Sequence, residues 1–80
     1  MGIMDAVILR LDALCSERGI TNNKMCTNAA VPQSTINNSV NGKTKNMGIV
    51  TLKKLIDSFD MTITDFFDDD IFRNLEQEIK

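Results

Sequence analysis

The chain contains no histidine, tryptophan or tyrosine, and it has only one proline and two cysteines among its 80 residues. Without histidine, a mixed Cys/His zinc site and histidine-based proton transfer are both excluded. Small oxidised domains usually carry several disulfides, so Cys15 and Cys26 are interpreted as reduced core residues. No base accompanies the remaining serine, cysteine and carboxylate groups. The sequence therefore predicts that the protein is not an enzyme and holds no cofactor.

Long hydrophobic stretches are also missing, which excludes a membrane-spanning helix. The longest apolar run is Ala6 to Leu9, whereas a membrane helix needs about 18 residues. The N-terminus lacks the basic and apolar regions of a secretory leader, and Ala6 stands where a myristoylation pattern requires Ser or Thr. With 42% apolar and 25% charged residues, the composition is that of one small globular domain. We expect a cytoplasmic protein.

Acidic residues are absent from the middle of the chain. Between Arg18 and Ile56 there is no Asp or Glu, although the net charge of the whole chain is −2. The basic residues of that segment are Arg18, Lys24, Lys43, Lys45, Lys53 and Lys54. This asymmetry favours an anionic partner for the central segment. The acidic run Asp68 to Asp70 lacks the alternating ligands and internal glycine of a Ca²⁺ loop, so it is interpreted as solvated charge and no metal is expected.

Apolar residues recur at helical spacing, and no segment alternates as a β-strand does. The expected helices span residues 3–18, 22–29, 33–41 and 49–59, followed by a helix that opens at Thr62 and carries Ile63, Phe66 and Phe67, and by a further apolar face over 71–80. Gly19 is expected to end the first helix, Thr21 or Asn22 to cap the second, and Thr62 to cap the fifth. Ile3, Val50 and Ile63 are counted on the buried faces. The predicted fold class is all-α, a compact bundle of five short helices with a C-terminal helical extension.

Two short helices joined by a tight turn at Ala30-Val31 have the layout of a helix-turn-helix. The second of these helices carries the amides of Gln33, Asn37 and Asn38 opposite its apolar side. Gln and Asn suit base recognition, because one amide can both donate to and accept from adenine in the major groove. Seven of the eight asparagines fall between positions 22 and 46. An alternative is that these asparagines only solvate and cap short helices.

Several stretches resemble the Cro/C1-type (XRE) helix-turn-helix domain of bacterial regulators and lambdoid phage repressors. The stretches are Val31-Pro32-Gln33-Ser34-Thr35-Ile36, Asn41-Gly42-Lys43-Thr44-Lys45-Asn46, Thr51-Leu52-Lys53-Lys54-Leu55 and Thr62-Ile63-Thr64-Asp65-Phe66-Phe67. The resemblance covers about residues 5–68. It implies a lambda repressor-like bundle that binds double-stranded DNA as a homodimer and regulates transcription, as a repressor.

The resemblance also assigns roles to individual residues. Those expected to contact bases are Gln33, Ser34, Asn37 and Asn38. Those expected to contact phosphates are Asn22, Thr35, Asn41, Lys43, Thr44, Lys45 and Asn46. The sequence departs from the family pattern at three places: Ala30 replaces the usual turn glycine, Ser39 replaces a large apolar residue, and Met47 replaces a proline.

The chain is expected to divide into a DNA-binding domain, residues 1–68, and a helical segment, residues 69–80, that packs on the bundle or pairs two copies. An alternative function remains open. The same fold can serve as a protein-interaction module, such as an antitoxin or antirepressor partner, with weak or no DNA binding. The low sequence pI of about 4.8 favours this alternative.

Overall fold

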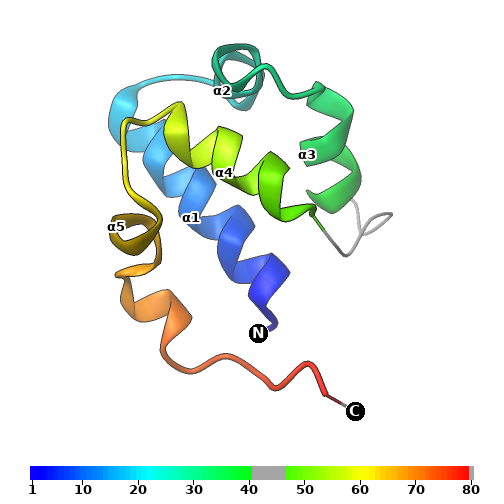
Figure 1. Cartoon of the computed structure of the whole chain (residues 1–80), viewed down its shortest axis with the longest axis vertical. Coiled ribbons are helices and arrows are strands. Elements are labelled where there is room, and N and C mark those ends of the chain that lie inside the picture. Colours follow the sequence, from blue (N-terminus) through cyan, green and yellow to red (C-terminus); the bar gives the residue numbers. More distant parts are fainter. Residues whose placement is uncertain (41–46, 80) are drawn as a thin grey trace.

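The computed structural model describes the backbone of residues 1–40 and 47–79, and the side chains of residues 1–36 and 47–79. Within these residues the chain is helical and contains no strand, as the sequence predicts. The elements are α1 (Ile3–Arg18), α2 (Asn22–Ala29), α3 (Gln33–Val40), α4 (Ile49–Asp57), α5 (Ile63–Phe67) and the single 3-10 turn η1 (Asp70–Phe72). In Figure 1, α1 and α4 form the centre of the bundle, and α3 and α5 lie on opposite sides of them.

Local signals set most of the helix ends. Gly19 ends α1 in the left-handed conformation, with φ 66°, which glycine adopts without steric cost. The hydroxyl of Thr21 accepts a hydrogen bond from the Lys24 amide at 3.1 Å and so caps α2. Thr62 caps α5 in the same way, through the Asp65 amide at 3.0 Å. Each hydroxyl pairs one of the amide groups that the first turn of a helix leaves without a partner.

One hydrophobic core unites the helices. It is formed by Val7, Leu11, Leu14, Cys15, Met25, Cys26, Ala29, Val31, Ile36, Leu55, Ile56, Phe59 and Phe66. Both cysteines are buried, and no disulfide joins them, as expected. Burial raises the pKa of the Cys15 thiol, with smaller contributions from Asp12 and Cys26, and burial also raises the pKa of Cys26. Both thiols are therefore neutral and poorly reactive in the folded protein.

Three residues expected on buried faces are exposed instead. Val50 is 67% exposed, Ile63 is 46% exposed and Ile3 is 40% exposed. Their positions fit the helical period, but the other described elements leave a large part of each side chain uncovered. Periodicity identifies the apolar face of a helix and does not say how much of that face the bundle covers.

The C-terminal segment does not form the helix expected over residues 71–80. Within the described residues 71–79 the only helical part belongs to the turn η1, which the Asp69 carboxylate caps by accepting from the Ile71 amide at 3.0 Å. Farther on, the Glu76 amide donates to the carbonyl of Met1 at 3.0 Å rather than to a carbonyl four residues back. The Glu76 carboxylate also pairs with the N-terminal amine at 3.1 Å. These bonds carry the segment back past the start of α1 (Figure 1).

Aromatic packing anchors the beginning of that segment. The ring of Phe72 lies 4.8 Å from the ring of Phe67 and 5.9 Å from the ring of Phe66, measured between centroids. Phe66 itself is fully buried in the core. Phe72 thus packs on the aromatic residues at the end of α5.

Candidate nucleic-acid interface

The turn between α2 and α3 sets the position of the first residues of α3. Ala30 ends α2 in the left-handed conformation, with φ 56°. The amide of Ala30 donates to the carbonyl of Thr27 at 3.2 Å, and the amide of Val31 donates to that of Cys26 at 3.0 Å. The turn conformation normally taken by glycine is therefore retained with alanine, at a steric cost. Val31 is buried, and the chain enters α3 directly after Pro32.

The start of α3 combines a buried anchor with exposed polar side chains. Ile36 is only 2% exposed and fixes the helix on the core. Gln33 and Ser34 are exposed, and Thr35 is half-buried. The Thr35 amide donates to the carbonyl of Pro32 at 3.0 Å. An exposed amide and hydroxyl in the first turn of a helix are groups that can reach the edges of base pairs in a major groove.

The first turn of α2 presents a second set of polar groups. Asn22, the phosphate candidate of this turn, is half-buried, whereas Asn23 and Lys24 are exposed. Among the described residues, Lys24 has no ion-pair partner. The positive end of the helix dipole adds to the attraction of this turn for an anion. Sequence reasoning passed over Lys24 as a contact, although a lysine in the first turn of a helix, within an acid-free segment, was the available signal.

The acidic residues from Asp65 onward lie away from α2 and α3 (Figure 1). They belong to α5, η1 and the C-terminal segment. Several of these acids are paired: Asp69 with Arg10 at 3.4 Å, and Asp68 and Asp70 with Arg73 at 3.1 and 2.7 Å. In the part of the chain that the structure describes, no group of three or more potential ligands gathers as a metal site.

The family model of the Cro/C1-type HTH (helix-turn-helix) DNA-binding domain matches residues 10–70. The chain belongs to this family. Searches of curated proteins and of solved structures find no match. The match covers α2, the turn at Ala30 and α3, together with α4 and α5. Membership in a DNA-binding family, with an all-helical fold, makes the chain a DNA-binding domain of the kind found in regulators.

The expected contact residues fall into two groups. Gln33, Ser34, Thr35 and Asn22 are described, and the structure brings the first three together in the first turn of α3. Asn37 and Asn38 lie in the second half of α3, but their side chains are outside the described residues, as are those of Ser39 and Val40. The five candidates of the loop, Asn41, Lys43, Thr44, Lys45 and Asn46, also lie outside the described residues.

The helices of the described chain are also too short and too polar to cross a membrane, as the sequence predicts.

Proposed function

We propose that this Cro/C1-type domain is a transcriptional repressor that binds operator DNA in the cytoplasm, as a homodimer, by placing the start of α3 in the major groove. Gln33 and Ser34 contact base edges, followed one helical turn later by Asn37 and Asn38. The observation that carries this proposal is the exposure of Gln33 and Ser34 on a helix anchored by the buried Ile36. A helix held in this way presents the same side chains to every site it meets.

Phosphate contacts hold the domain in register on the duplex. The contacts we propose come from Asn22, Thr35, Asn41, Lys43, Thr44, Lys45 and Asn46, to which the structure adds the exposed Lys24. Such contacts position the protein and carry no sequence information of their own. In this proposal the bound domain represses transcription by blocking the access of polymerase to the DNA that it covers.

The test begins by selecting bound oligonucleotides from a random pool, which supplies an operator sequence. Gln33→Ala is then expected to weaken operator binding by about 1–3 kcal/mol and to relax the preference at one base pair. Lys43→Ala is expected to weaken binding to all sequences about equally, because a phosphate contact does not depend on the base. Binding curves on the selected site and on single-base variants separate the two effects.

Gln77→Ala is the matched control, because Gln77 is an exposed glutamine on the C-terminal segment, outside the helix-turn-helix. It is expected to bind like the wild type. If Gln33→Ala also binds like the wild type and keeps every base preference, α3 does not read the groove and the proposal fails.

A further inference from the structure

The chain contains only three arginines, and the one nearest in sequence to the helix-turn-helix is held away from the start of α3. The guanidinium of Arg18 donates to the carbonyl of Phe59 at 2.9 Å and lies over the ring of the same residue, 5.6 Å from its centroid. Phe59 follows α4, at the end of that helix that is farther from α3 (Figure 1). These two contacts place the guanidinium at that end of the bundle.

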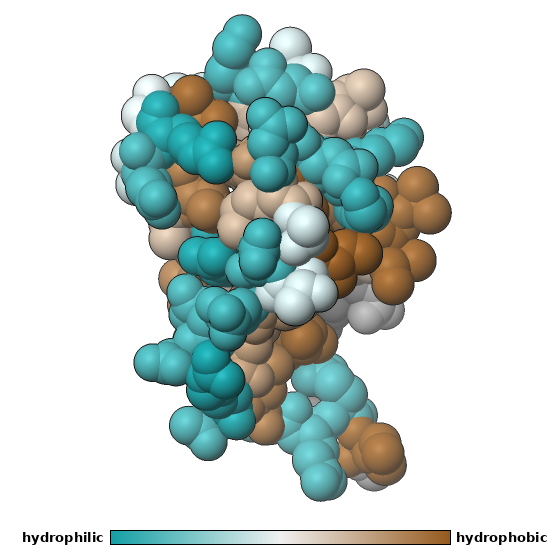
Figure 2. All heavy atoms as spheres, turned by 60° about the vertical axis from the view of Figure 1, so that its left-hand side comes forward, coloured by the Kyte–Doolittle hydropathy of each residue, from teal (hydrophilic) through white to brown (hydrophobic). Residues whose placement is uncertain are grey.

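The other two arginines lie on the side of α5. Arg10 pairs with Asp69, and Arg73 pairs with Asp68 and Asp70. Figure 2 turns this side of the molecule forward and shows a largely hydrophilic front. Because this side is away from α2 and α3, neither guanidinium faces a duplex that those helices bind.

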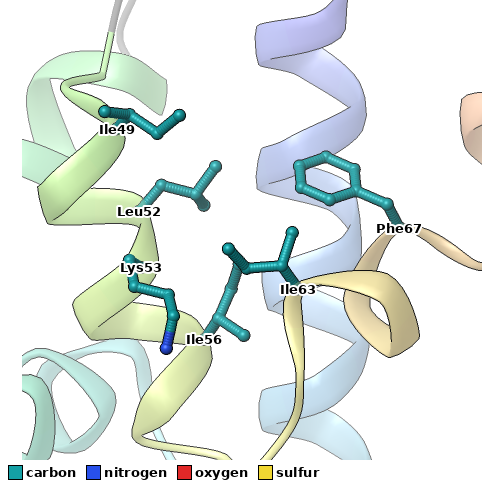
Figure 3. Close-up of a pocket in the computed structure, with 6 residues that line it drawn as sticks. All are labelled: Ile49, Leu52, Lys53, Ile56, Ile63 and Phe67. Carbon is teal, nitrogen blue, oxygen red and sulfur yellow. The ribbon is translucent and has the colours of Figure 1, made fainter.

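The recognition helix itself carries no cation. The sequence of α3 (Gln33–Val40) contains neither arginine nor lysine. Lys24 belongs to the first turn of α2, where we propose a phosphate contact. Lys53 and Lys54 belong to α4, and Lys53 pairs with Asp57, with its side chain running along α4 away from the start of that helix (Figure 3). Base contacts from the start of α3 are therefore left to uncharged amides and hydroxyls.

The absence of a cation limits the base that the first turn of α3 can recognise. In the major groove guanine presents two acceptors, O6 and N7, with which an arginine fork makes the commonest specific contact. Adenine presents the N6 donor next to the N7 acceptor, and this pair matches the acceptor and donor of one amide. Opposite guanine, the amide oxygen of Gln33 meets no donor on that base. The side chain of Gln33 therefore discriminates in favour of adenine.

We propose that the base pair contacted by Gln33 is an A·T pair, recognised through N6 and N7 of adenine, and that the first turn of α3 requires no guanine in the operator. The hydroxyl of Ser34 both donates and accepts, so it adds no requirement for guanine. The inference deepens the proposed function and rests on it, because it needs α3 to lie in the major groove.

The packing of α3 directs Gln33 to one base pair. Ile36, one turn later, is 2% exposed, and the Thr35 amide donates to the carbonyl of Pro32 at 3.0 Å within the first turn. The backbone that carries Gln33 is thus fixed on the core. The amide of Gln33 then meets the same position of the site in each complex.

An adenine analogue tests the contact. In the operator selected from the random pool, the adenine at the base pair whose preference Gln33→Ala relaxes is replaced by 7-deazaadenine, which has a carbon in place of N7. The wild type is expected to lose about tenfold or more in affinity. Gln33→Ala is expected to lose little, because it already lacks the contact. The same replacement at an adenine whose preference Gln33→Ala leaves unchanged is the control within the DNA.

An introduced arginine tests the choice of base. Gln33→Arg is expected to change the preference at this base pair from adenine to guanine, because a guanidinium fork can pair with O6 and N7. Gln77→Arg adds the same charge on the C-terminal segment, outside the helix-turn-helix, and is expected to keep the preference for adenine. Fluorescence anisotropy on four operators that differ only at this base pair measures both variants, and thermal unfolding checks that each folds.

The outcomes separate this inference from the proposed function. A selected operator with guanine at the base pair that Gln33 contacts, or full affinity of the wild type for the 7-deazaadenine site, overturns the inference and leaves the proposed function standing. A Gln33→Arg chain that still prefers adenine also contradicts it. A wild-type chain that selects no oligonucleotide from the pool overturns the proposed function and this inference with it.

Discussion

Ala30 adopts a backbone conformation that costs an L-residue with a β-carbon about 1–2 kcal/mol. Its φ is 56°, and Asp60, at the exit of α4, has nearly the same value, 57°. The two positions differ in the help that the side chain gives. Asp tolerates left-handed φ because its short polar side chain can bond locally, whereas Ala has no such group. The hydrogen bonds of the turn between α2 and α3 thus hold Ala30 in a left-handed conformation that alanine disfavours.

Ala30→Gly is expected to stabilise the protein by about 0.5–1 kcal/mol. Glycine removes the steric cost of the left-handed conformation, and the larger conformational entropy that it gives the unfolded chain offsets only part of this gain. The side chain of Ala30 is exposed, so no core contact is lost. Urea unfolding measures the change. Asp60→Gly is the comparison and should gain less; an equal or larger gain there would show that the Asp60 side chain does not ease its left-handed conformation, and no gain from Ala30→Gly would show that the β-carbon does not strain the turn.

Arg10 connects two elements that are distant in sequence, α1 and the end of α5. Its guanidinium donates to the carbonyls of Phe66 at 2.9 Å and of Asp65 at 3.3 Å. It also pairs with Asp69 at 3.4 Å and lies over the ring of Phe66, 5.8 Å from the centroid. With only 16% of its side chain exposed, Arg10 gives the Phe66 carbonyl at the end of α5 a partner, and it shares the Asp65 carbonyl with the amide of Asp68.

Arg10→Met is therefore expected to lower the free energy of unfolding by about 1–3 kcal/mol, since methionine retains the apolar stem and removes the hydrogen bonds to the carbonyls. Arg73→Met is the control. Arg73 also pairs with two aspartates, but its side chain is 59% exposed, so little change is expected there. Chemical denaturation of both variants provides the measurement. Comparable losses would mean that surface charge, rather than the link between α1 and α5, accounts for the effect.

The elements differ in how far the sequence alone predicts them. The ends of α1, α2 and α5 follow from Gly19, Thr21 and Thr62, each of which acts within its own turn. The C-terminal segment was predicted wrongly as a helix, because its conformation depends on bonds to Met1, which is distant in sequence. Local patterns contain no information about such partners.

The candidate site shows the same division. The spacing from Gln33 to Ile36 predicts an exposed polar start and a buried anchor, and both are found. The exposure of Lys24, Val50 and Ile63 depends on which surfaces the other helices leave uncovered. That property belongs to the packing of the whole bundle, so residue periodicity does not predict it.

At the scale of the whole molecule, the binding of DNA depends on a basic segment within a chain of net charge −2. Lysines that contact phosphates displace the counterions condensed on the duplex, so affinity falls steeply with salt. For about four or more phosphate contacts, operator affinity is expected to fall by about a hundredfold or more between about 50 and about 200 mM salt.

Fluorescence anisotropy over a salt series measures this slope. The variant Lys24→Ala should flatten it by about one unit if Lys24 contacts a phosphate. An affinity that is nearly independent of salt would instead favour the protein-interaction module, whose contacts are mainly apolar.

The acids of α5 and the C-terminal segment lie on the side away from α2 and α3 (Figure 1), which gives the molecule an electric dipole. Near a duplex, the field of the phosphates exerts a torque on such a dipole and turns the acidic side outward before contact. Rotational alignment of this kind raises the fraction of encounters in which the recognition surface arrives first. A protein of low pI can thereby find a polyanion quickly while its overall charge limits adhesion to unrelated sequences.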